Sequence, residues 1–527
     1  MRPAALFHSG TIMSLFAVFN IFLLLAIRPI HPIDETRYIS VAWEMWQNSS
    51  WIVPYENGEP YAHKPPLVFW LIHLAWSLFG VSDIAARFTI PLVTCTNYLL
   101  IRALAKCFFP GSQLAVHLSP VVLFSLFGWD LYLSLTMFDL LLTVFIQSFI
   151  LFTWHFSESR KFQYVLLAGV SLGFALLTKG PVTFAYIVPA IATYAWWRQD
   201  FMVNPLVFFN HMALALLLGT LMFMCWLLPA LFLGGVAYTN DLIWSQVTGR
   251  IVDSFAHSRP FYWYVMLLPI LLLPLPLLRC IWQANLLGNK HLQGRILIFW
   301  ALCILVIFSA ISGKQIHYLL PAFPFVALFI SGNIKPEGSW REPILGITLL
   351  LFTVVIFSEP WWVNVIFPNI ETANTYAILG LIPLLLAFIS FKNLQKWRQR
   401  TIFYFLCVPI AISSLLASLS PLLFNAYDLQ PYANQVKQLQ QKKVTVVSWE
   451  KYHAQFQFMG RLSEPILQLT GTRQEKLQWL QQNPDAHLIL IVPHMTKRQA
   501  RLSVYSQAYR GRYILLFAAR YSTILIE

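Results

Sequence analysis

Long apolar segments separated by short polar turns run along the chain from residue 11 to residue 422. A helix needs about 20 apolar residues to cross the hydrocarbon core of a bilayer. On this rule the chain is predicted to form about thirteen membrane-spanning helices, at residues 11–29, 84–106, 114–128, 131–154, 162–177, 181–197, 209–233, 262–283, 294–312, 317–332, 343–359, 374–391 and 401–422. The predicted fold class is therefore a polytopic α-helical membrane protein.

The segment that follows the first predicted span has a different pattern. Residues 29–83 are long, and they are rich in Trp, Tyr, Pro and charged residues. Tryptophans such as Trp43, Trp46 and Trp51 are typical of helices that lie in the membrane interface without crossing it. We expect juxtamembrane helices here.

The chain becomes more polar from about residue 425. Residues 442–449 and 487–493 have the pattern of strands, residues 473–483 that of a polar helix, and residues 513–526 that of one or two further strands. We therefore predict two domains. A membrane domain comprises residues 1–424, with outer loops at 30–83 and 234–261, and a small soluble α/β domain comprises residues 425–527.

The composition excludes a water-soluble protein of this size. The chain is 58% hydrophobic and 11% charged, whereas soluble domains carry roughly 25% charged residues. The net charge is +14, but the Lys and Arg residues gather in short clusters between predicted spans, so membrane topology explains them better than nucleic acid does. The six cysteines show no C-x-x-C spacing, which argues against a disulfide framework or a zinc site.

The basic clusters predict the orientation of the chain. Under the predicted spans they all fall on one side of the membrane, and they comprise Arg102 and Lys106, Arg160 and Lys161, Arg198, Lys290 and Arg295, Lys335 and Arg341, and Lys392, Lys396, Arg398 and Arg400. The positive-inside rule makes this side cytoplasmic. The N-terminus is then cytoplasmic, and the C-terminal domain lies on the outer side.

Acidic residues that border apolar segments are candidates for function, because a carboxylate is costly to hold there. Asp34 and Glu35 directly follow the first predicted span. They suit the orientation of a hydroxyl or an amine, or the role of a general base, although acidic residues also favour the first turn of any helix. Asp139 lies within an apolar helix and is expected to face a cavity or a cation. Asp130, at a predicted turn, is expected to be solvated.

Several cations fall on the same outer side as these acids. They are Lys64 beside Tyr61 and a Pro-Pro pair, Lys179 in a turn, Arg250 in the second outer loop, and Lys314 close to Tyr318. Each alone is compatible with a cation that reaches for lipid headgroups. Together they fit an anionic ligand presented from the membrane, because preorganised cations stabilise negative charge that develops on a phosphate. No cofactor is predicted, and a divalent metal finds no support in the sequence.

Four motifs occur in an order that resembles the GT-C glycosyltransferases, in particular the bacterial lipid A aminoarabinose transferase family, which is related to protein O-mannosyltransferases. The motifs are DETRY (34–38), YAHKPP (61–66), LTKGP (177–181) and KQIHYLLP (314–321). The resemblance implies a membrane domain of about thirteen helices in the bacterial inner membrane and a periplasmic C-terminal domain. It also implies undecaprenyl phosphate as the sugar carrier, inversion at the transferred carbon, and lipid A or a related glycolipid as the acceptor.

The resemblance also implies roles for single residues. The catalytic carboxylates would be Asp34, Glu35 and Asp139, and the carrier phosphate would contact Tyr61, Lys64, Arg250 and Tyr318. Some positions depart from the family pattern. His63 stands where the family often has Glu, and Ser245 and Val247 stand where the lipid A enzyme has histidines. A metal site near Arg250 and strict aminoarabinose specificity are therefore not implied, so another amino sugar or a neutral hexose remains open.

Two other functions fit parts of the pattern. A protein hydroxyl as acceptor would require the Asp34–Glu35 pair to act as a true base. A flippase for a lipid-linked sugar predicts two pseudo-symmetric halves with broken helices and charges at the membrane midplane. The sequence has its candidate charges at one face instead, so the transferase is the favoured prediction.

Overall fold

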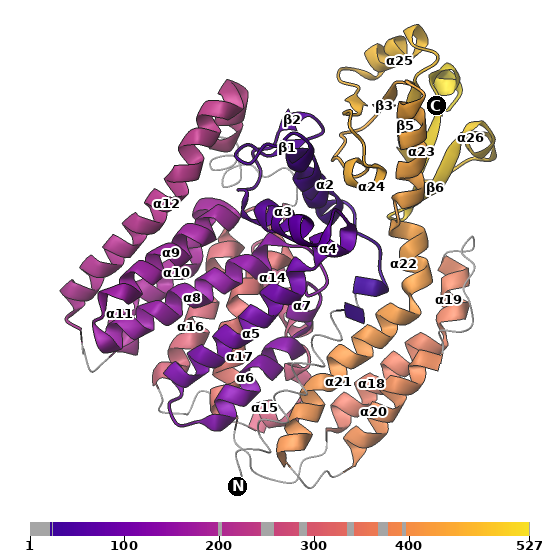
Figure 1. The fold of residues 1–527 in the computed structure, drawn as a ribbon. Coiled ribbons are helices and arrows are strands. Elements are labelled where there is room, and N and C mark those ends of the chain that lie inside the picture. The colour runs from indigo at the N-terminus through magenta and orange to yellow at the C-terminus, as the bar shows by residue number, and fades with distance from the viewer. Residues whose placement is uncertain are drawn as a thin grey trace.

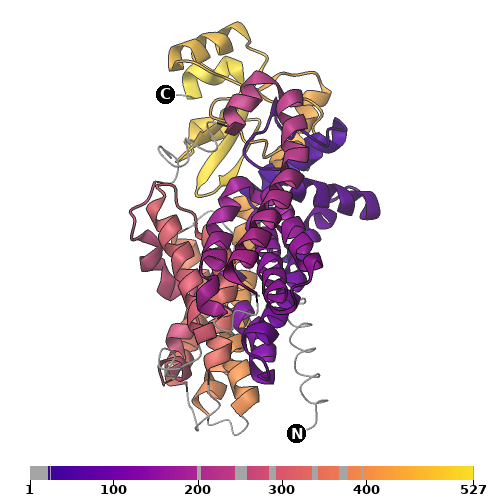
Figure 2. The same ribbon diagram turned by 90° about the vertical axis from the view of Figure 1, so that its left-hand side faces the viewer.

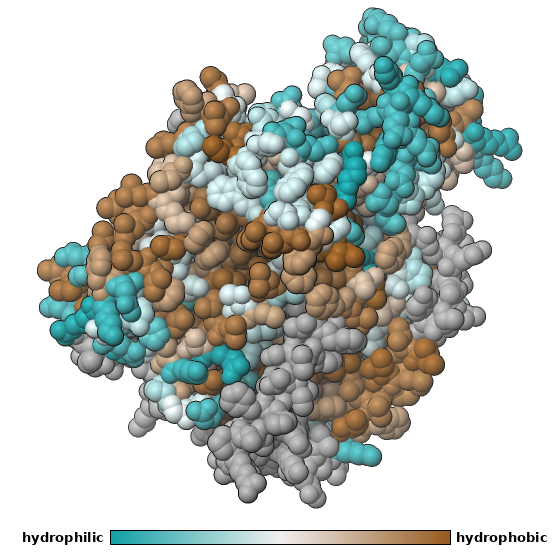
Figure 3. All heavy atoms as spheres, in the orientation of Figure 1, coloured by the Kyte–Doolittle hydropathy of each residue, from teal (hydrophilic) through white to brown (hydrophobic). Residues whose placement is uncertain are grey.

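The computed structural model describes residues 22–23, 25–198, 203–243, 258–283, 292–334, 342–366, 378–392 and 397–525. It has a large helical unit and a smaller unit with a sheet, which lies at one end of the long helices (Figures 1 and 2). Apolar residues cover much of the helical unit, whereas the visible face of the smaller unit is largely hydrophilic (Figure 3). The predicted span at residues 11–29 lies mostly outside the described residues.

The helical unit contains the expected apolar helices. Among the described residues, six helices are long and apolar enough to cross a membrane, namely Asp83–Phe108, Phe138–Ser159, Phe162–Ala192, Pro205–Ile243, Ile316–Asn333 and Thr401–Ser418. Shorter apolar helices lie at Leu67–Phe79, Gln113–Ser125, Gly294–Ala310, Pro343–Phe357 and Ile378–Phe391. The helical membrane class is confirmed, and the number of thirteen spans stays a prediction.

The elements of this unit follow in chain order. The helices are α2 (Asp34–Gln47), α3 (Leu67–Phe79), α4 (Asp83–Arg87), α5 (Thr89–Phe108), α6 (Gln113–Ser125), α7 (Phe127–Asp130), α8 (Phe138–Ser159), α9 (Phe162–Lys179), α10 (Phe184–Ala192), α11 (Tyr194–Trp197), α12 (Pro205–Asn240), α14 (Trp263–Leu271), α15 (Arg279–Gln283), α16 (Leu292–Ala310), α17 (Phe323–Asn333), α18 (Pro343–Phe357), α19 (Glu359–Ile366), α20 (Leu381–Phe391), α21 (Trp397–Ser418) and α22 (Ser420–Tyr427). Strands β1 (Tyr55–Glu56) and β2 (Glu59–Pro60) form a small hairpin, and a 3₁₀ helix, η4, spans Ile316–Ala322. The predicted outer loop thus contains two helices, α2 and α3.

Several predicted spans differ from the observed helices, and two of them show the physical reason. The span at 131–154 begins as a helix only at Phe138, because residues 131–137 form turns that are bonded to another part of the chain, as described below. The span at 262–283 is interrupted after Leu271, where Pro274 and Pro276 follow. Proline lacks the N–H group that a continuing helix would need.

Close packing of α9 sets the position of Lys179 at its end. Helix α9 packs against both α8 and α12 (Figure 1). A Cβ atom on Gly219 of α12 would lie 2.8 Å from the carbonyl oxygen of Gly169 on α9. Such small residues let two helices approach closely in a membrane, where dispersion contacts between helices contribute much of the stability.

The smaller unit is a five-stranded mixed sheet with helices. Its strand order is β4-β3-β5-β7-β6, in which β3 is parallel to β4 and β5, and β7 is antiparallel to β5 and β6. The strands are β3 (Val446–Ser448), β4 (Leu467–Gln468), β5 (His487–Val492), β6 (Tyr505–Tyr509) and β7 (Arg512–Ala518), and the helices are α23 (Gln430–Gln441), α24 (Gln457–Gly460), α25 (Arg473–Gln482), α26 (Lys497–Leu502) and α27 (Ser522–Leu525).

The elements predicted for this part of the chain are largely confirmed. Strands β3 and β5 lie within the two predicted strand segments, and α25 lies within 473–483, where Thr472 and Glu475 form a capping box. Strand β7 lies mostly within 513–526, but the end of that segment is helical and β6 precedes it. The domain boundary near residue 425 stays a prediction.

The smaller unit contacts α2, α3 and the β1–β2 turn through hydrogen bonds and ring stacking. The side chain of Asn57, in the turn, donates to the carbonyl of Ile466 (2.8 Å), and its amide oxygen accepts from the backbone of Ile466 (2.7 Å) and from Gln457 (2.9 Å). The ring of Phe458 stacks on Trp76 of α3 at 5.4 Å between centroids, and its backbone N–H donates to Ser40 of α2. The unit therefore holds the elements that flank the candidate site.

Candidate active site

The first pair of the site joins the ends of α8 and α9. Asp139 lies in the first turn of α8, and Lys179 is the last residue of α9. These positions suit their charges, because a helix dipole favours an anion at the N-terminus and a cation at the C-terminus. The two side chains form a buried ion pair, with exposed fractions of 2% and 5%. The expectation that Asp139 faces a cation is confirmed.

The KQIHYLLP motif, in η4, adds two aromatic side chains to this pair. The Nε2 atom of His317 lies 3.8 Å from the second carboxylate oxygen of Asp139. The ammonium of Lys179 lies over the ring of Tyr318, 4.4 Å from its centroid. His317 was not predicted as a site residue, and the only sign of it in the sequence is its position next to Tyr318 in the motif.

The YAHKPP motif lies beside the start of α8. The ammonium of Lys64 lies over the ring of Phe138, 5.4 Å from its centroid, and Phe138 directly precedes Asp139. Tyr61 is buried and stacks on His63 at 5.1 Å. Lys64 is also largely buried. The structure therefore brings Lys64 to the same place as Asp139, although 75 positions of sequence separate them.

Helix α2 brings the first acidic motif to the same region. The ring of Tyr38 packs edge-on against Phe138 at 4.8 Å. Burial raises the pKa of Tyr38 well above its usual range, and the nearby carboxylates of Asp34 and Asp139 both raise it further. These two carboxylates therefore lie near the same tyrosine. Asp34 forms an ion pair with Arg37 one turn along α2, and its side chain is 45% exposed.

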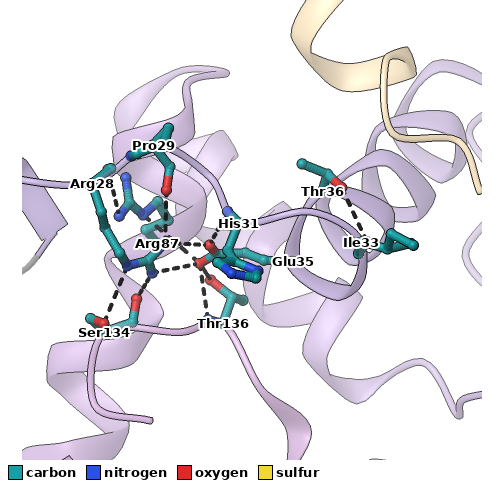
Figure 4. A network of polar contacts seen from close by, with 9 residues as sticks. All are labelled: Arg28, Pro29, His31, Ile33, Glu35, Thr36, Arg87, Ser134 and Thr136. Atoms are coloured by element: carbon teal, nitrogen blue, oxygen red, sulfur yellow. Dashed lines mark hydrogen bonds and ion pairs between the residues drawn. The ribbon is translucent and has the colours of Figure 1, made fainter. Parts of the chain in front are cut away.

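Glu35, unlike Asp34, lies in a buried network of polar contacts, and Figure 4 shows this network. Its buried carboxylate accepts five hydrogen bonds, two from Arg28 (2.6 and 3.1 Å), one from the His31 backbone (2.8 Å), and two from the backbone and hydroxyl of Thr136 (3.0 Å each). Arg87 lies 3.9 Å away. The network ties α2 and α4 to the turns that lead into Asp139, which explains why α8 begins late.

This network decides what Glu35 can do chemically. Burial by itself raises the pKa of Glu35, but the charge and hydrogen bonds of Arg28, together with Arg87, lower it to about 2. A carboxylate with this pKa is a poor general base near neutral pH, because an efficient base has a pKa close to the working pH. Since its oxygens are already occupied, the geometry favours a positioning role. The sequence did not reveal this, because Arg28, Arg87 and Thr136 carry no recognisable pattern.

Three other residues from the sequence analysis lie elsewhere. Lys314 is buried, and its ammonium donates to the carbonyls of Arg259 (3.0 Å) and Ile311 (2.5 Å). Its contact with a donor phosphate stays a prediction. Arg250 lies outside the described residues. The prediction that Asp130 is solvated is wrong, because α7 packs against α14 and η4 and leaves Asp130 only 2% exposed.

Known proteins match this chain over the region that carries the site. A family model described as dolichyl-phosphate-mannose-protein mannosyltransferase matches residues 63–228, which include Lys64, Asp139 and Lys179. The undecaprenyl phosphate-alpha-4-amino-4-deoxy-L-arabinose arabinosyl transferase of Edwardsiella ictaluri is 31% identical over 357 residues, 63% of this chain and 62% of that protein. The enzyme of the same name from Aeromonas hydrophila is 28% identical over 366 residues, 66% of this chain and 65% of that protein. The aligned parts thus span just under two thirds of these relatives.

Solved structures match the fold over nearly the whole chain. The crystal structure of ArnT from Cupriavidus metallidurans bound to undecaprenyl phosphate superposes with a TM-score of 0.74 at 17% identity and covers 98% of both chains. The apo structure of that protein gives a TM-score of 0.72 at 16% identity, with 97% of this chain and 98% of that one covered. In sequence the chain therefore resembles these aminoarabinose transferases and, over part of its length, the protein mannosyltransferase family model, and in fold it resembles ArnT, as its motifs predicted.

Proposed function

We propose that this chain is an inverting glycosyltransferase that moves a sugar from undecaprenyl phosphate to lipid A, or to a related glycolipid, at the periplasmic face of the inner membrane. The names of its relatives suggest 4-amino-4-deoxy-L-arabinose as the sugar. The observation that carries the proposal is the meeting of Lys64, Lys179 and Asp139 at one end of α8, beside Asp34. Two cations and two carboxylates at the end of a membrane helix suit a phosphate-linked amino sugar.

The cations suit the bond that breaks. An oxygen of the acceptor attacks the anomeric carbon, the bond from this carbon to the phosphate oxygen breaks, and undecaprenyl phosphate leaves with the electron pair. Negative charge therefore grows on that phosphate. Lys64 would stabilise it, since preorganised cations in a low-dielectric site lower such barriers. Tyr61, Tyr318 and Arg250 would complete the phosphate site, as the resemblance implies.

The carboxylates have separate roles in this proposal. Asp34 is half-exposed and would orient the amine of the sugar or the incoming acceptor. Asp139 would hold Lys179 in place through their buried ion pair. Glu35 would position α2. A lipid A phosphate is a fitting acceptor, because a phosphate monoester with a second pKa near 6 is already largely ionised and needs no strong base.

The residues at the two ends of α8 support the proposed side of the membrane. The helix has 22 residues, so it is about 33 Å long and matches the hydrocarbon core of a bilayer. Asp139 lies at its first turn, and Arg160 follows its last. Arg160 belongs to a basic cluster that the positive-inside rule assigns to the cytoplasm. The candidate site would then face the periplasm.

A reconstituted reaction tests this proposal. The purified full chain is mixed in neutral detergent with lipid A and undecaprenyl phosphate that carries 4-amino-4-deoxy-L-arabinose. We expect mass spectrometry to find lipid A heavier by one pentosamine and an equal amount of released undecaprenyl phosphate. Release of the carrier without a modified lipid A would contradict lipid A as the acceptor, and an intact donor would contradict the transferase itself.

A further inference from the structure

The turn between β6 and β7 carries an arginine where the backbone favours another residue. The two strands pair up to Tyr509 and Arg512, so Arg510 and Gly511 form a two-residue turn. Both residues have positive φ, 53° and 77°. Turns of this kind favour Asn, Asp or Gly at both positions, because a Cβ atom is unfavourable there. The backbone conformation therefore does not explain why an arginine occupies position 510, so the explanation lies in its side chain.

This turn contacts the end of α22, and α22 contacts the residues that precede α2. The backbone N–H of Arg510 donates to the carbonyl of Ala426 at 3.1 Å, and the hairpin runs down to α22 (Figures 1 and 2). The next residue, Tyr427, stacks on His31 at 4.9 Å between ring centroids. The backbone N–H of His31 in turn donates to Glu35. Three contacts thus link Arg510 to the DETRY motif.

The guanidinium of Arg510 also acts electrostatically on His31, which precedes this motif. Burial lowers the pKa of His31, the carboxylate of Glu35 opposes this, and the charges of Arg28 and Arg510 lower the pKa further. Arg28 is bound to Glu35, whereas Arg510 is exposed and interacts with the hydroxyl of Tyr509. A guanidinium has five N–H donors, so one such contact leaves the planar fork able to bind a phosphate with two hydrogen bonds.

The segment that carries the hairpin is basic, and the acids that act on the hairpin tyrosines, Asp428 and Glu450, come from outside this segment. Residues 486–526 contain no Asp or Glu and six cations, namely Lys497, Arg498, Arg501, Arg510, Arg512 and Arg520. All six are exposed. The cations of the candidate active site are Lys64 and Lys179. They lie near Phe138 and Asp139, where Tyr38 at the end of the DETRY motif also packs.

We propose that Arg510 binds a phosphate group of the acceptor and so selects an anionic glycolipid over a neutral hydroxyl acceptor. The inference rests on the proposed function, and it assigns to the hairpin of the smaller unit a part in acceptor recognition. A guanidinium suits this task better than an ammonium, because it matches the geometry of a phosphate with two parallel hydrogen bonds.

Substitution of two arginines in the same unit tests the inference. Arg510→Gln removes the charge but keeps a long side chain at the same backbone position. Arg520→Gln is the matched control, because Arg520 is an equally exposed cation at the far end of β7. The initial transfer rate of each purified full chain is measured against lipid A concentration in neutral detergent. A charge-assisted hydrogen-bonded contact is worth a factor of about 10 to 100 in affinity.

We expect Arg510→Gln to raise the KM for lipid A by about tenfold or more. The kcat of this variant and its KM for the donor should stay at the wild-type level. The KM of Arg520→Gln for lipid A should also equal that of the wild type. Arg510→Lys should recover part of the loss. Equal KM values in Arg510→Gln and Arg520→Gln, or a fall in kcat at unchanged KM, would overturn the inference.

Two further measurements are needed. The first distinguishes a lipid A phosphate from an ordinary phospholipid headgroup, and the second distinguishes the role of Arg510 from the proposed transferase function. Under this inference, phosphatidylglycerol at the same concentration as lipid A leaves the wild-type KM unchanged; full competition would mean a general headgroup site and would contradict acceptor selection. Equilibrium binding of lipid A without donor should be weakened by Arg510→Gln even in a chain that transfers nothing. Loss of transfer in the wild type contradicts the proposed function, whereas equal binding in both chains contradicts only the role of Arg510.

Discussion

The two adjacent carboxylates of the DETRY motif differ at the scale of single residues. Asp34 is half-exposed and paired only with Arg37 among the contacts described for it, whereas Glu35 is buried in a network of Arg28, Arg87 and Thr136. Solvent screens the half-exposed carboxylate of the Asp34–Arg37 pair, which weakens the contribution of this pair to stability. A buried pair is different, because the removal of one partner leaves an uncompensated charge. Asp34 is therefore the candidate for chemistry, whereas Glu35 stabilises the structure.

This difference predicts opposite effects for two conservative substitutions. Asp34→Asn should abolish transfer and leave the free energy of unfolding unchanged within about 1 kcal/mol. Glu35→Gln should lower the free energy of unfolding by about 3–5 kcal/mol, because Arg28 and Arg87 lose their counter-charge. Denaturant unfolding in mixed micelles and the transfer assay measure both quantities. The separation fails if Asp34→Asn unfolds as easily as Glu35→Gln.

The pKa of Glu35 predicts how stability depends on pH. In the folded chain it is about 2, against an ordinary value of 4.5. A lowered folded-state pKa means that the contribution of Glu35 is fully present above about pH 4.5 and is lost as the pH falls toward 2. The wild type should lose this contribution in that window, and Glu35→Gln should not. Unfolding midpoints at several pH values measure it, and equal slopes in both chains would contradict the prediction.

Lys64 provides the direct test of the phosphate site. Lys64→Ala should reduce kcat/KM for transfer by on the order of 10²- to 10³-fold, as expected when one preorganised group that stabilises developing charge is lost. Lys161→Ala is the matched control, because Lys161 is an exposed cation just beyond the opposite end of α8. Equal activity in the two variants would remove Lys64 from the site.

At the scale of elements, the site depends on how α2, α8 and the β1–β2 hairpin are held together. Phe138 makes edge contacts with Tyr38 of α2 and Phe69 of α3, so the start of α8 packs against both juxtamembrane helices. The smaller unit holds the other side of α2 through Phe458 and the hairpin through Asn57. Its segment 457–466 therefore acts as a brace for the elements that carry Asp34 and Lys64.

Asn57 allows this brace to be tested. Asn57→Ala removes three hydrogen bonds to the smaller unit, each worth roughly 1 kcal/mol, and it also places alanine at a positive φ of 55°. We expect faster hydrogen exchange in residues 457–466 and a lower kcat. Asn57→Asp is the control for the backbone, because Asp also tolerates positive φ and keeps the accepting oxygen. Unchanged exchange in Asn57→Ala would show that the contacts do not hold the units together.

Much of the element pattern could be predicted from the sequence, and most of the site's geometry could not. Apolar length predicts α8 and α12, and strand patterns predict β3 and β5, because these depend on neighbouring residues. The late start of α8 depends on Thr136 bonding to Glu35 across 101 positions of the chain. The pairing of Asp139 with Lys179, 40 positions apart, and the approach of Arg510 to His31 likewise depend on packing. The local sequence pattern does not encode contacts between distant residues. The motifs therefore identified candidate site residues but not the residues with which they pair.

At the scale of the whole molecule, the helices, the juxtamembrane elements and the smaller unit converge on one end of α8. Arg160 and Lys161 lie at the opposite end of α8, and the length of this helix matches a bilayer. This arrangement suits a donor whose lipid tail stays in the membrane while its phosphate and sugar reach the surface. The smaller unit lies on that same side and supplies both the brace at Asn57 and the hairpin with Arg510.

The central claim is that the chain transfers a sugar to lipid A, and the mass of lipid A tests it most directly. Lipid A is extracted from cells that make undecaprenyl-phosphate-linked sugar and that either lack this chain, contain it, or contain its Lys64→Ala variant. We predict that a pentosamine or hexosamine mass appears on a lipid A phosphate only with the wild-type chain. Identical lipid A in all three strains would contradict the account and direct the search to proteins that lose a glycan instead.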